Sequence, residues 1–389
     1  MKPAAPAPTT TKPAPAAAPV ASSPAPRVPQ PAQKNHDDEE DDMDLDKAAA
    51  AVFLRRHIVH TPSAYTSMHG QRLTLVQFIL ATLDVMGHLD KEVDTETKVA
   101  LVKWVYSLQH PHGGFVGSDH IPEADLASTY SALVCLVILG DTLAAVNRKT
   151  MAKWLHRLQS PTTGGYRQYE SQPEDLTDLR FGYCAMVTRK LLGIPLASTA
   201  RDAAIEYIAA KQTYEGGFGL KPPSEAHGGY TYCAVAALAL LDALDRIRDR
   251  SALIHWAVAR QELGYSGRIG KPNDTCYSFW IGASLAMLDA LDLIDPDKNA
   301  LYLCSQRTLF GGLSKDATSP PDLLHTYMGI AGMALQQHLL PAMAAKVQLA
   351  DLDVVTNISV RALRHLHAAG GPDVLKDEQH AAAAIEVAE

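Results

Sequence analysis

The feature that most constrains the fold is an internal repeat in the middle of the chain. The segments WVYSLQHPHGGF (104–115), WLHRLQSPTTGGY (154–166) and YIAAKQTYEGGF (207–218) share one plan, and residues 256–267 and 302–312 follow it more loosely. In each copy a helical pattern ends at a glutamine, a few polar residues follow, and glycine allows a sharp turn. The anchoring glutamines recur every 45–53 residues, at Gln109, Gln159, Gln212, Gln261 and Gln306.

A second, more apolar helical pattern follows each turn. We expect these helices at 127–139, 178–192, 228–244, 276–292 and 322–340, and strand-like alternation is absent. An amphipathic pair at 48–60 and 72–88 precedes them, so the chain predicts six stacked helical hairpins. The second helices are apolar on nearly every face, which favours burial on both sides as the inner ring of an α/α toroid over an open solenoid. The fold class is therefore all-α.

The segments that flank the repeat are unlike it. Residues 1–35 carry ten prolines, and eight of the residues 37–46 are acidic. Such a segment cannot offset its ordering entropy, so we expect a disordered tail at 1–46, a toroid domain at 47–369 and a loose tail at 370–389. The tail at 1–46 could serve as an interaction arm or only keep the protein in solution.

Composition excludes several function classes. The net charge of −8 argues against a nucleic-acid-binding protein, and no apolar run reaches membrane-spanning length. The N-terminus lacks the apolar region of a signal peptide, so we expect a cytoplasmic protein. The five cysteines are an odd number, widely spread, and fit reduced thiols better than a disulfide framework.

Within the segment KPNDTCYSFW (271–280), an aspartate and a cysteine stand two residues apart at the expected start of a helix. Asp274 is a good N-cap residue, and Cys276 would lie in the first turn, where free N–H groups favour a thiolate. The pair could hold half of a zinc shell. Taken alone, the pair is more simply interpreted as a helix cap and a small buried residue.

The loops before the inner helices should meet at one rim of a toroid. Three of them are 225–233, 267–277 and 319–327, and together they contain Asp274, Cys276, His325, His227, Arg268, Lys271 and Tyr277. Oxygen, sulfur and nitrogen ligands from three residues would leave the fourth zinc position open, as catalytic zinc requires. The two cations match what a diphosphate needs. Each residue alone has a simpler interpretation, as a core histidine or as loop surface.

These motifs carry a resemblance to a known family. The GGF-type turns, AHGGYTYC (226–233), GKPNDTCYSFW (270–280) and PPDLLHTYMGI (320–330) resemble the β subunit of protein prenyltransferases, over about residues 50–340. The resemblance implies an α/α toroid, a helical-repeat α subunit as partner, and transfer of an isoprenoid from its diphosphate to a cysteine near a protein's C-terminus. It implies that Asp274, Cys276 and His325 bind one Zn²⁺ per heterodimer.

The resemblance also implies roles for other residues. His227, Arg268, Lys271 and Tyr277 match the diphosphate contacts, and Tyr277 and Lys315 join the zinc ligands as catalytic residues. The isoprenoid contacts would be Thr74, Tyr130, Arg180, Tyr183, Tyr230 and Trp280. The aromatic residues of this group could instead be plain inner-helix core.

Within the family, the chain most resembles geranylgeranyltransferase type I. Thr74 stands where farnesyltransferases place a bulky tryptophan, which leaves room for a 20-carbon lipid. Lys315 stands at a magnesium-binding acidic position of farnesyltransferases, so Mg²⁺ should not be required. Phe181 also resembles this subtype, whereas Asp125 stands where relatives carry a histidine, a place that His120 could fill instead.

The resemblance implies geranylgeranyl diphosphate as donor and, as acceptors, CaaX proteins ending mainly in leucine, such as Rho-type small GTPases. Alternatives are a farnesyltransferase or Rab geranylgeranyltransferase β subunit and, more remotely, a non-catalytic helical scaffold. A terpene-cyclase-like toroid would need an acidic cluster that the folded part of the sequence lacks.

Overall fold

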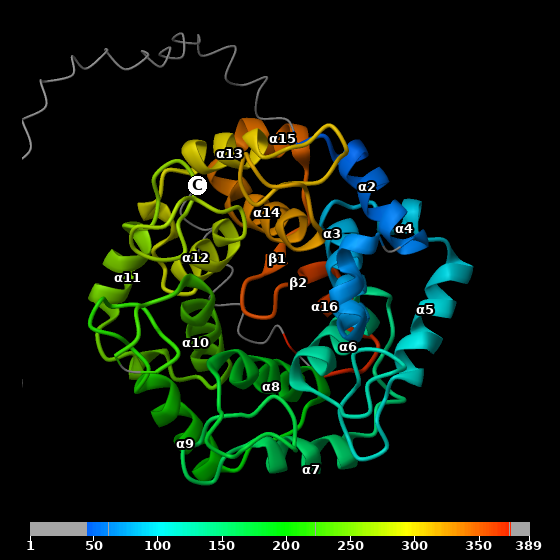
Figure 1. Cartoon of the computed structure of the whole chain (residues 1–389), viewed down its shortest axis with the longest axis vertical. Helices are drawn as coiled ribbons and strands as arrows, with labels where there is room; N and C mark the ends of the chain where they lie inside the picture. Colours follow the sequence, from blue (N-terminus) through cyan, green and yellow to red (C-terminus); the bar gives the residue numbers. More distant parts are fainter. Residues whose placement is uncertain (1–44, 61, 222, 373, 375–389) are drawn as a thin grey trace, which may run out of the picture.

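The computed structural model describes residues 45–372 apart from 61 and 222, together with residue 374. Within this part of the chain, two concentric rings of helices form a closed barrel (Figure 1). The inner helices are α3 (Arg72–Val85), α6 (Leu126–Ile138), α8 (Leu179–Leu192), α10 (Gly228–Leu240), α12 (Tyr277–Ala286) and α14 (Leu323–Gln336). Their outer partners are α2 (Lys47–Val59), α5 (Thr95–Ser107), α7 (Arg148–Leu158), α9 (Ser198–Ala209), α11 (Arg250–Val258) and α13 (Pro296–Ser305).

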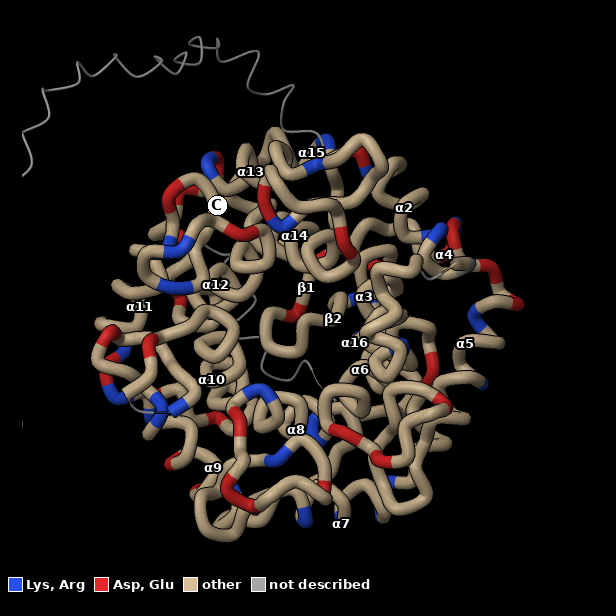
Figure 2. Tube along the Cα trace, in the orientation of Figure 1, with Lys and Arg blue, Asp and Glu red and all other residues tan. Residues whose placement is uncertain are grey.

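Each inner helix packs against the next, and α14 packs against α3. This last contact closes the ring, so the predicted α/α toroid of six hairpins is confirmed for the described residues. The burial pattern agrees with the two roles. The inner helices α6, α10, α12 and α14 contain no Lys, Arg, Asp or Glu, whereas the outer helix α7 buries only Met151, Trp154, Leu155 and Leu158 on one face. Charged residues gather on the outer helices and loops (Figure 2).

The repeated glutamines hold neighbouring hairpins together. The Gln212 side chain donates to the carbonyl of Asp249 at 2.8 Å and accepts from its N–H at 3.0 Å. Asp249 caps α11, the outer helix of the next hairpin. Gln261 makes the same pair of hydrogen bonds with Asp295, which caps α13. Gln212 and Gln261 therefore link their turns to the start of the next outer helix.

The repeated glycines allow each turn to approach the outer helix of the next hairpin closely. A Cβ atom on Gly216 would lie 2.3 Å from the carbonyl oxygen of Ala252 in α11, so no other residue fits there without displacing backbone. In the same way, a Cβ atom on Gly311 of the last repeat would lie 2.2 Å from the carbonyl oxygen of Ala49 in α2. The glycine turns thus close the outer ring as well.

The inner helices begin at one rim of the barrel. The loops that precede them are joined by backbone hydrogen bonds of 2.9–3.1 Å, from Leu73 N to Gly117 O, Leu126 N to Gln168 O, Gly228 N to Gly267 O and Thr275 N to Lys315 O. The expected convergence of these loops is therefore present, and it brings together residues that are far apart in the sequence.

The chain after α14 was not anticipated in detail. It forms the outer helix α15 (Pro341–Val347), then a short hairpin of β1 (Leu352–Asp353) and β2 (Ile358–Ser359), then α16 (Val360–Ala368). The hairpin lies at the centre of the ring in projection (Figure 1). Three tyrosine hydroxyls of inner helices donate to its carbonyls, namely Tyr130 to Thr356 at 3.0 Å, Tyr232 to Val354 at 3.2 Å and Tyr327 to Asn357 at 2.9 Å.

The inner helices α10, α12 and α14 end four to six residues earlier than expected. The helices expected to reach residues 244 and 292 stop at Leu240 and Ala286, because Asp242 and Asp289 adopt left-handed backbone with φ of 49°. Short 3₁₀ turns follow at η2 (Leu244–Arg246) and η3 (Leu291–Leu293), and η4 (Gln337–Leu339) follows α14. The remaining elements are η1 (Ser63–Gln71) and α4 (Leu89–Glu92).

Nearly all of the tail expected at 1–46 lies outside the described residues, as does most of the segment expected to be loose at 370–389, so both domain boundaries stay predictions. Leu45 is buried, and the Asp46 side chain accepts a hydrogen bond from Ala49 N at 3.0 Å, which caps α2. None of the helices in the described part of the chain combines the length and apolar composition that crossing a bilayer requires.

Candidate functional site

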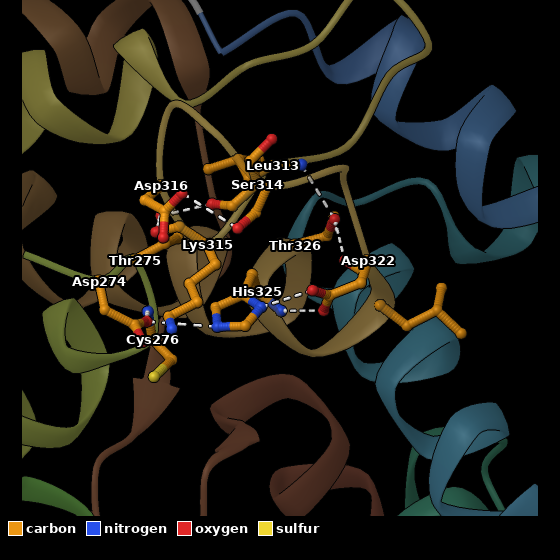
Figure 3. A network of polar contacts seen from close by, with 12 residues as sticks. Asp274, Thr275, Cys276, Leu313, Ser314, Lys315, Asp316, Asp322, His325 and Thr326 are labelled. Carbon is orange, nitrogen blue, oxygen red and sulfur yellow. Dashed lines mark hydrogen bonds and ion pairs between the residues drawn. The ribbon is translucent and has the colours of Figure 1, made fainter. Parts of the chain in front are cut away.

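Three ligand-type side chains converge at the rim (Figure 3). Asp274 and Cys276 come from the turn before α12, and His325 comes from the first turn of α14. One ligand atom from each lies within 4.8 Å of the others, and His325 Nε2 is 3.2 Å from Asp274 Oδ1. The convergence predicted for this triad is therefore found in the structure.

The local backbone differs slightly from the expectation. Helix α12 begins at Tyr277, so Asp274 is not its N-cap. The Asp274 carboxylate instead accepts a hydrogen bond from Cys276 N at 3.0 Å, and its carbonyl accepts from Tyr277 N at 3.1 Å. A tight turn therefore precedes the helix and holds the carboxylate and the thiol on the same side.

The pKa shifts of His325 and Cys276 indicate that the triad needs a positive charge, supplied by a proton or by a bound cation. Burial alone would lower the pKa of His325, but hydrogen bonds to Asp274 and Asp322 outweigh it and raise the pKa to about 9. Burial raises the pKa of the Cys276 thiol, and the charge of Asp274 raises it further. Without a cation, a proton on His325 balances the carboxylates and the thiol stays neutral. A bound cation would displace both protons.

The donor set fits zinc. Carboxylate oxygen, thiolate sulfur and imidazole nitrogen all bind Zn²⁺ at about 2.0–2.3 Å, which places tetrahedral ligand atoms about 3.3–3.8 Å apart. The separations within the triad are close enough for small side-chain rotations to reach that geometry. Three protein ligands also leave one position for a substrate atom.

The sequence-based interpretation missed the role of Asp322. This residue caps α14 by accepting from His325 N at 2.9 Å, and its second carboxylate oxygen lies 2.6 Å from His325 Nδ1. An acceptor at Nδ1 fixes the ring and leaves Nε2 for the metal. The Asp-x-x-His spacing at a helix start carries this signal, since the cap residue and the third residue after it share one turn.

We expect Asp322→Asn to weaken zinc binding about 10- to 100-fold, because the amide still caps α14 but no longer holds the imidazole with a charge. Chelator competition on the purified protein measures the affinity. Asp316→Asn, in the preceding loop, is the matched control. Equal zinc affinity in Asp322→Asn and wild type would contradict the role.

A second polar cluster lies beside the triad on the same rim. Tyr277 follows Cys276 directly, and its hydroxyl lies 3.1 Å from Nε2 of His227, the N-cap residue of α10. Arg268 is half-exposed and pairs with Glu225 at 2.6 Å, and Lys271 is exposed. The structure thus brings His227 and Tyr277 into contact and places both cations in the adjoining loop, as the sequence predicts.

The predicted isoprenoid contacts all lie on inner helices. Tyr183 is buried against Tyr130 and Tyr232, with ring centroids 5.6 and 5.3 Å away. Trp280 packs on Tyr232 at 5.0 Å. Tyr130, Tyr230 and Trp280 are partly exposed.

Two further predicted contacts are polar. The Arg180 guanidinium forms a bidentate pair with Asp178, the cap of α8, at 2.7 and 3.0 Å, and lies 5.3 Å from the Tyr230 ring centroid. Thr74 in α3 is partly exposed, and its hydroxyl lies 3.2 Å from the hydroxyl of Ser131 in α6. A small side chain therefore stands where these two inner helices meet.

Comparison with known proteins gives the same family from sequence and fold. The family model "Prenyltransferase alpha-alpha toroid domain" matches residues 45–364. The geranylgeranyl transferase type-1 subunit beta of Dictyostelium discoideum is 34% identical over 332 residues, which cover 75% of this chain and 90% of the relative. The chain belongs to the protein prenyltransferase β-subunit family.

The chain is also similar to a farnesyltransferase subunit and to a solved prenyltransferase structure. The protein farnesyltransferase subunit beta of Schizosaccharomyces pombe is 33% identical over 300 residues, 72% of this chain and 76% of the relative. A solved Candida albicans protein geranylgeranyltransferase-I complexed with GGPP superposes with a TM-score of 0.74 at 23% identity, over 82% of this chain and 97% of that one. This structural match supports the α/α toroid fold.

The structure also places the residues from which the sequence analysis inferred the subtype, namely Lys315, Asp125, His120 and Phe181. Figure 3 shows the Lys315 side chain extending beside the His325 ring toward the triad. Asp125 caps α6 by accepting from Ser128 N at 2.9 Å, whereas His120 is exposed and packs against His69 with ring centroids 5.4 Å apart. Phe181 is partly exposed in the first turn of α8.

Proposed function

We propose that the chain is the catalytic β subunit of a protein geranylgeranyltransferase type I. It transfers a geranylgeranyl group from its diphosphate to the cysteine thiol of C-terminal CaaX sequences in which X is mainly leucine. The observation that carries this proposal is the placement of the Asp274–Cys276–His325 triad directly beside the His227–Tyr277 pair on one rim. A thiol-activating centre and a diphosphate-binding cluster meet there.

The chemistry divides between the two clusters. Asp274, Cys276 and His325 would hold a zinc ion, and that ion would lower the pKa of a substrate thiol, which is about 8.5 when free, and so supply a thiolate at neutral pH. The cations Arg268 and Lys271 and the Tyr277 hydroxyl stabilise the charge that builds on the leaving diphosphate. Glu225 holds Arg268 until the diphosphate arrives. The thiolate sulfur forms the new C–S bond as the C–O bond to diphosphate breaks.

A protein partner is favoured by the surface of the same rim. Tyr214, Leu263 and Phe310 each lie in the turn after an anchoring glutamine and are 86%, 56% and 72% exposed. Exposed apolar side chains in three successive turns favour a protein-binding surface. We propose a helical-repeat α subunit as this partner and small GTPases of the Rho type among the substrates. A cytoplasmic location fits such substrates and stays a prediction.

Two residues favour the 20-carbon donor over the 15-carbon one. Overall identity does not choose between them, because type I and farnesyltransferase relatives are almost equally identical to this chain. Thr74 leaves space on α3 that a tryptophan would fill. Lys315 places a positive charge near the triad without Mg²⁺. The similarity to protein prenyltransferase subunits also favours this function over a terpene cyclase.

We expect transfer by the wild-type enzyme to be independent of Mg²⁺, because the Lys315 ammonium supplies the charge that the metal would supply. Lys315→Asp should lower the magnesium-free rate about 10-fold or more and make the enzyme respond to added Mg²⁺. Initial rates in magnesium-free buffer and after addition of Mg²⁺ measure both effects. Lys153→Asp on the exposed face of α7 is the control. An unchanged magnesium-free rate in Lys315→Asp would remove this role.

The function itself is tested with the chain co-expressed with an α subunit. Geranylgeranyl diphosphate and a peptide ending Cys-a-a-Leu should yield a thioether product detected by mass spectrometry. The peptide with serine in place of cysteine should remain unmodified. A folded, zinc-loaded heterodimer that modifies neither peptide would overturn the proposal and favour the Rab-specific enzyme or a scaffold.

A further inference from the structure

Within the described chain, one junction of the outer ring lacks the glycine turn found at the other five. At those five, a Cβ atom on the turn glycine would lie 2.2–2.5 Å from an atom of the next outer helix, and the glycines are Gly113, Gly164, Gly216, Gly264 and Gly311. The segment that follows α2, residues 60–71, contains no glutamine followed by such a turn. It forms η1, in which no described residue is buried. The next outer helix, α5, is therefore not held by a turn of the preceding hairpin.

A cavity of about 240 Å³ lies at this junction, between α2, α3 and α5. These three helices are neighbours in the ring (Figure 1). Ile58 of α2 and Leu101 and Trp104 of α5 line the cavity and are partly exposed, whereas Leu75 and Ile79 of α3 are buried at its base. Covering partly exposed apolar side chains is favourable. The α2–α5 junction is therefore a surface that another segment can fill.

The cavity is bordered by positive charge at one end. Arg72, the first residue of α3, lines it, and Arg55 and Arg56 are exposed on α2 beside the lining residue His57. Arg55 Nε lies 3.8 Å from Glu92 of α4. Arg56 and Arg72 form no ion pair with any other residue that the structure describes. The segment that fits this junction therefore combines acidic residues with an apolar part.

The N-terminal part of this chain begins close enough to reach the arginines. Leu45 is buried, and Lys47 Nζ donates to Met86 O at 3.4 Å, which places the start of α2 beside the end of α3, away from Arg72. Helix α2 has 13 residues and is about 20 Å long. Eight extended residues span about 26 Å. Residues 37–44, seven of which are acidic, can therefore reach Arg72.

The apolar part of the occupant is also present in the sequence. Residues 24–31 read PAPRVPQP and precede the acidic residues. Proline-rich segments bind grooves lined by aromatic side chains, because their extended conformation costs little further entropy to fix. Trp104, with Leu101 beside it, provides such a surface in the cavity.

We propose that residues 24–44, which lie outside the described residues, dock on the α2–α5 junction of their own chain. The acidic residues pair with Arg55, Arg56 and Arg72, and the proline-rich residues cover Trp104. The segment then takes the place of the turn that this junction lacks. The N-terminal tail is thus an interaction arm for its own toroid, whatever reaction the toroid catalyses.

Binding of the separate segment tests the proposal. A fluorescent peptide of residues 20–44 is added to heterodimer whose β chain lacks residues 1–44, and fluorescence anisotropy measures the dissociation constant. We expect saturable binding that Arg56→Glu combined with Arg72→Glu weakens about 10-fold or more. Lys153→Glu, on the exposed face of α7, should bind as wild type does. Absence of binding, or equal binding by the arginine variant, would overturn the proposal.

A second peptide tests the apolar contact. Its charge is unchanged, and serine replaces the prolines at positions 24, 26, 29 and 31. It should bind about 5-fold more weakly or less tightly still, because the contact with Trp104 is lost. Equal affinity of the two peptides would mean that the acidic residues bind without the cavity, and the proposed docking would be wrong.

The full-length heterodimer provides a test that does not require the shortened chain to fold. Carbodiimide joins a carboxylate to a lysine in direct contact with it. In Arg72→Lys, which keeps the positive charge, mass spectrometry should find the introduced lysine joined to residues 37–44, and Lys153 should not be joined to them. Crosslinks of residues 37–44 to Lys153 as often as to position 72, or to the α subunit alone, would contradict docking at the α2–α5 junction.

Discussion

Zinc should be absent from the His325→Ala variant of the purified heterodimer. His325 supplies the nitrogen of a three-residue ligand set and is the member that comes from a different hairpin, α13–α14. Its loss leaves only Asp274 and Cys276 as protein ligands, so two of the four zinc positions are open, one more than in a catalytic zinc site. Metal analysis should change from about one zinc per heterodimer to nearly none, and prenyl transfer should be lost with it.

The matched control is His338→Ala, the same exchange in η4 beyond the other end of α14, where the side chain is exposed. It should keep its zinc. Circular dichroism and the melting temperature establish that both variants are folded. Retention of stoichiometric zinc by folded His325→Ala would show that the triad is not the metal site.

Thr74→Trp should reverse the donor preference. Thr74 lies where α3 meets Ser131 of α6, and an indole there would occupy space that the last isoprene unit of a 20-carbon chain requires. We expect the ratio of kcat/KM for the 20-carbon donor to that for the 15-carbon donor to fall about 100-fold or more, because a clash of this size costs several kcal/mol.

Thr74→Val separates size from polarity, since it removes the hydroxyl bonded to Ser131 but keeps the volume. It should keep the preference for the 20-carbon donor. If Thr74→Trp and Thr74→Val show the same ratio as wild type, lipid length is determined elsewhere.

The fold could be predicted because each repeat is marked by short-range sequence features. The anchoring glutamines, the glycine turns and the alternation of amphipathic and apolar helices are each visible within about fifty residues. The contacts that the repeated glutamines and glycines make between hairpins could not be predicted from the sequence. The bonds from Gln212 to the cap of the next outer helix, and the approach of Gly311 to α2, join hairpins that periodicity alone cannot place against each other.

The zinc-ligand residues were predicted from sequence motifs. The residues that were missed depend on side-chain geometry, which the motifs do not show. Asp274, Cys276 and His325 could be grouped because the loops before inner helices must share a rim. Asp322 was missed because its cap and its contact to His325 both depend on side-chain direction. The hairpin at 352–359 was missed because two-residue strands leave almost no pattern. Of the three inner-helix tyrosines that hold it, only Tyr130 was singled out from the sequence, as a lipid contact.

The measurement that tests the central claim most directly is a competition between the two lipid donors. Wild-type heterodimer receives equimolar geranylgeranyl and farnesyl diphosphate and a Cys-a-a-Leu peptide in a buffer prepared without magnesium. The products are separated by mass. We predict that the geranylgeranyl thioether is the dominant product under these conditions. A dominant farnesyl product, or product only after Mg²⁺ is added, would contradict the assignment to geranylgeranyltransferase type I.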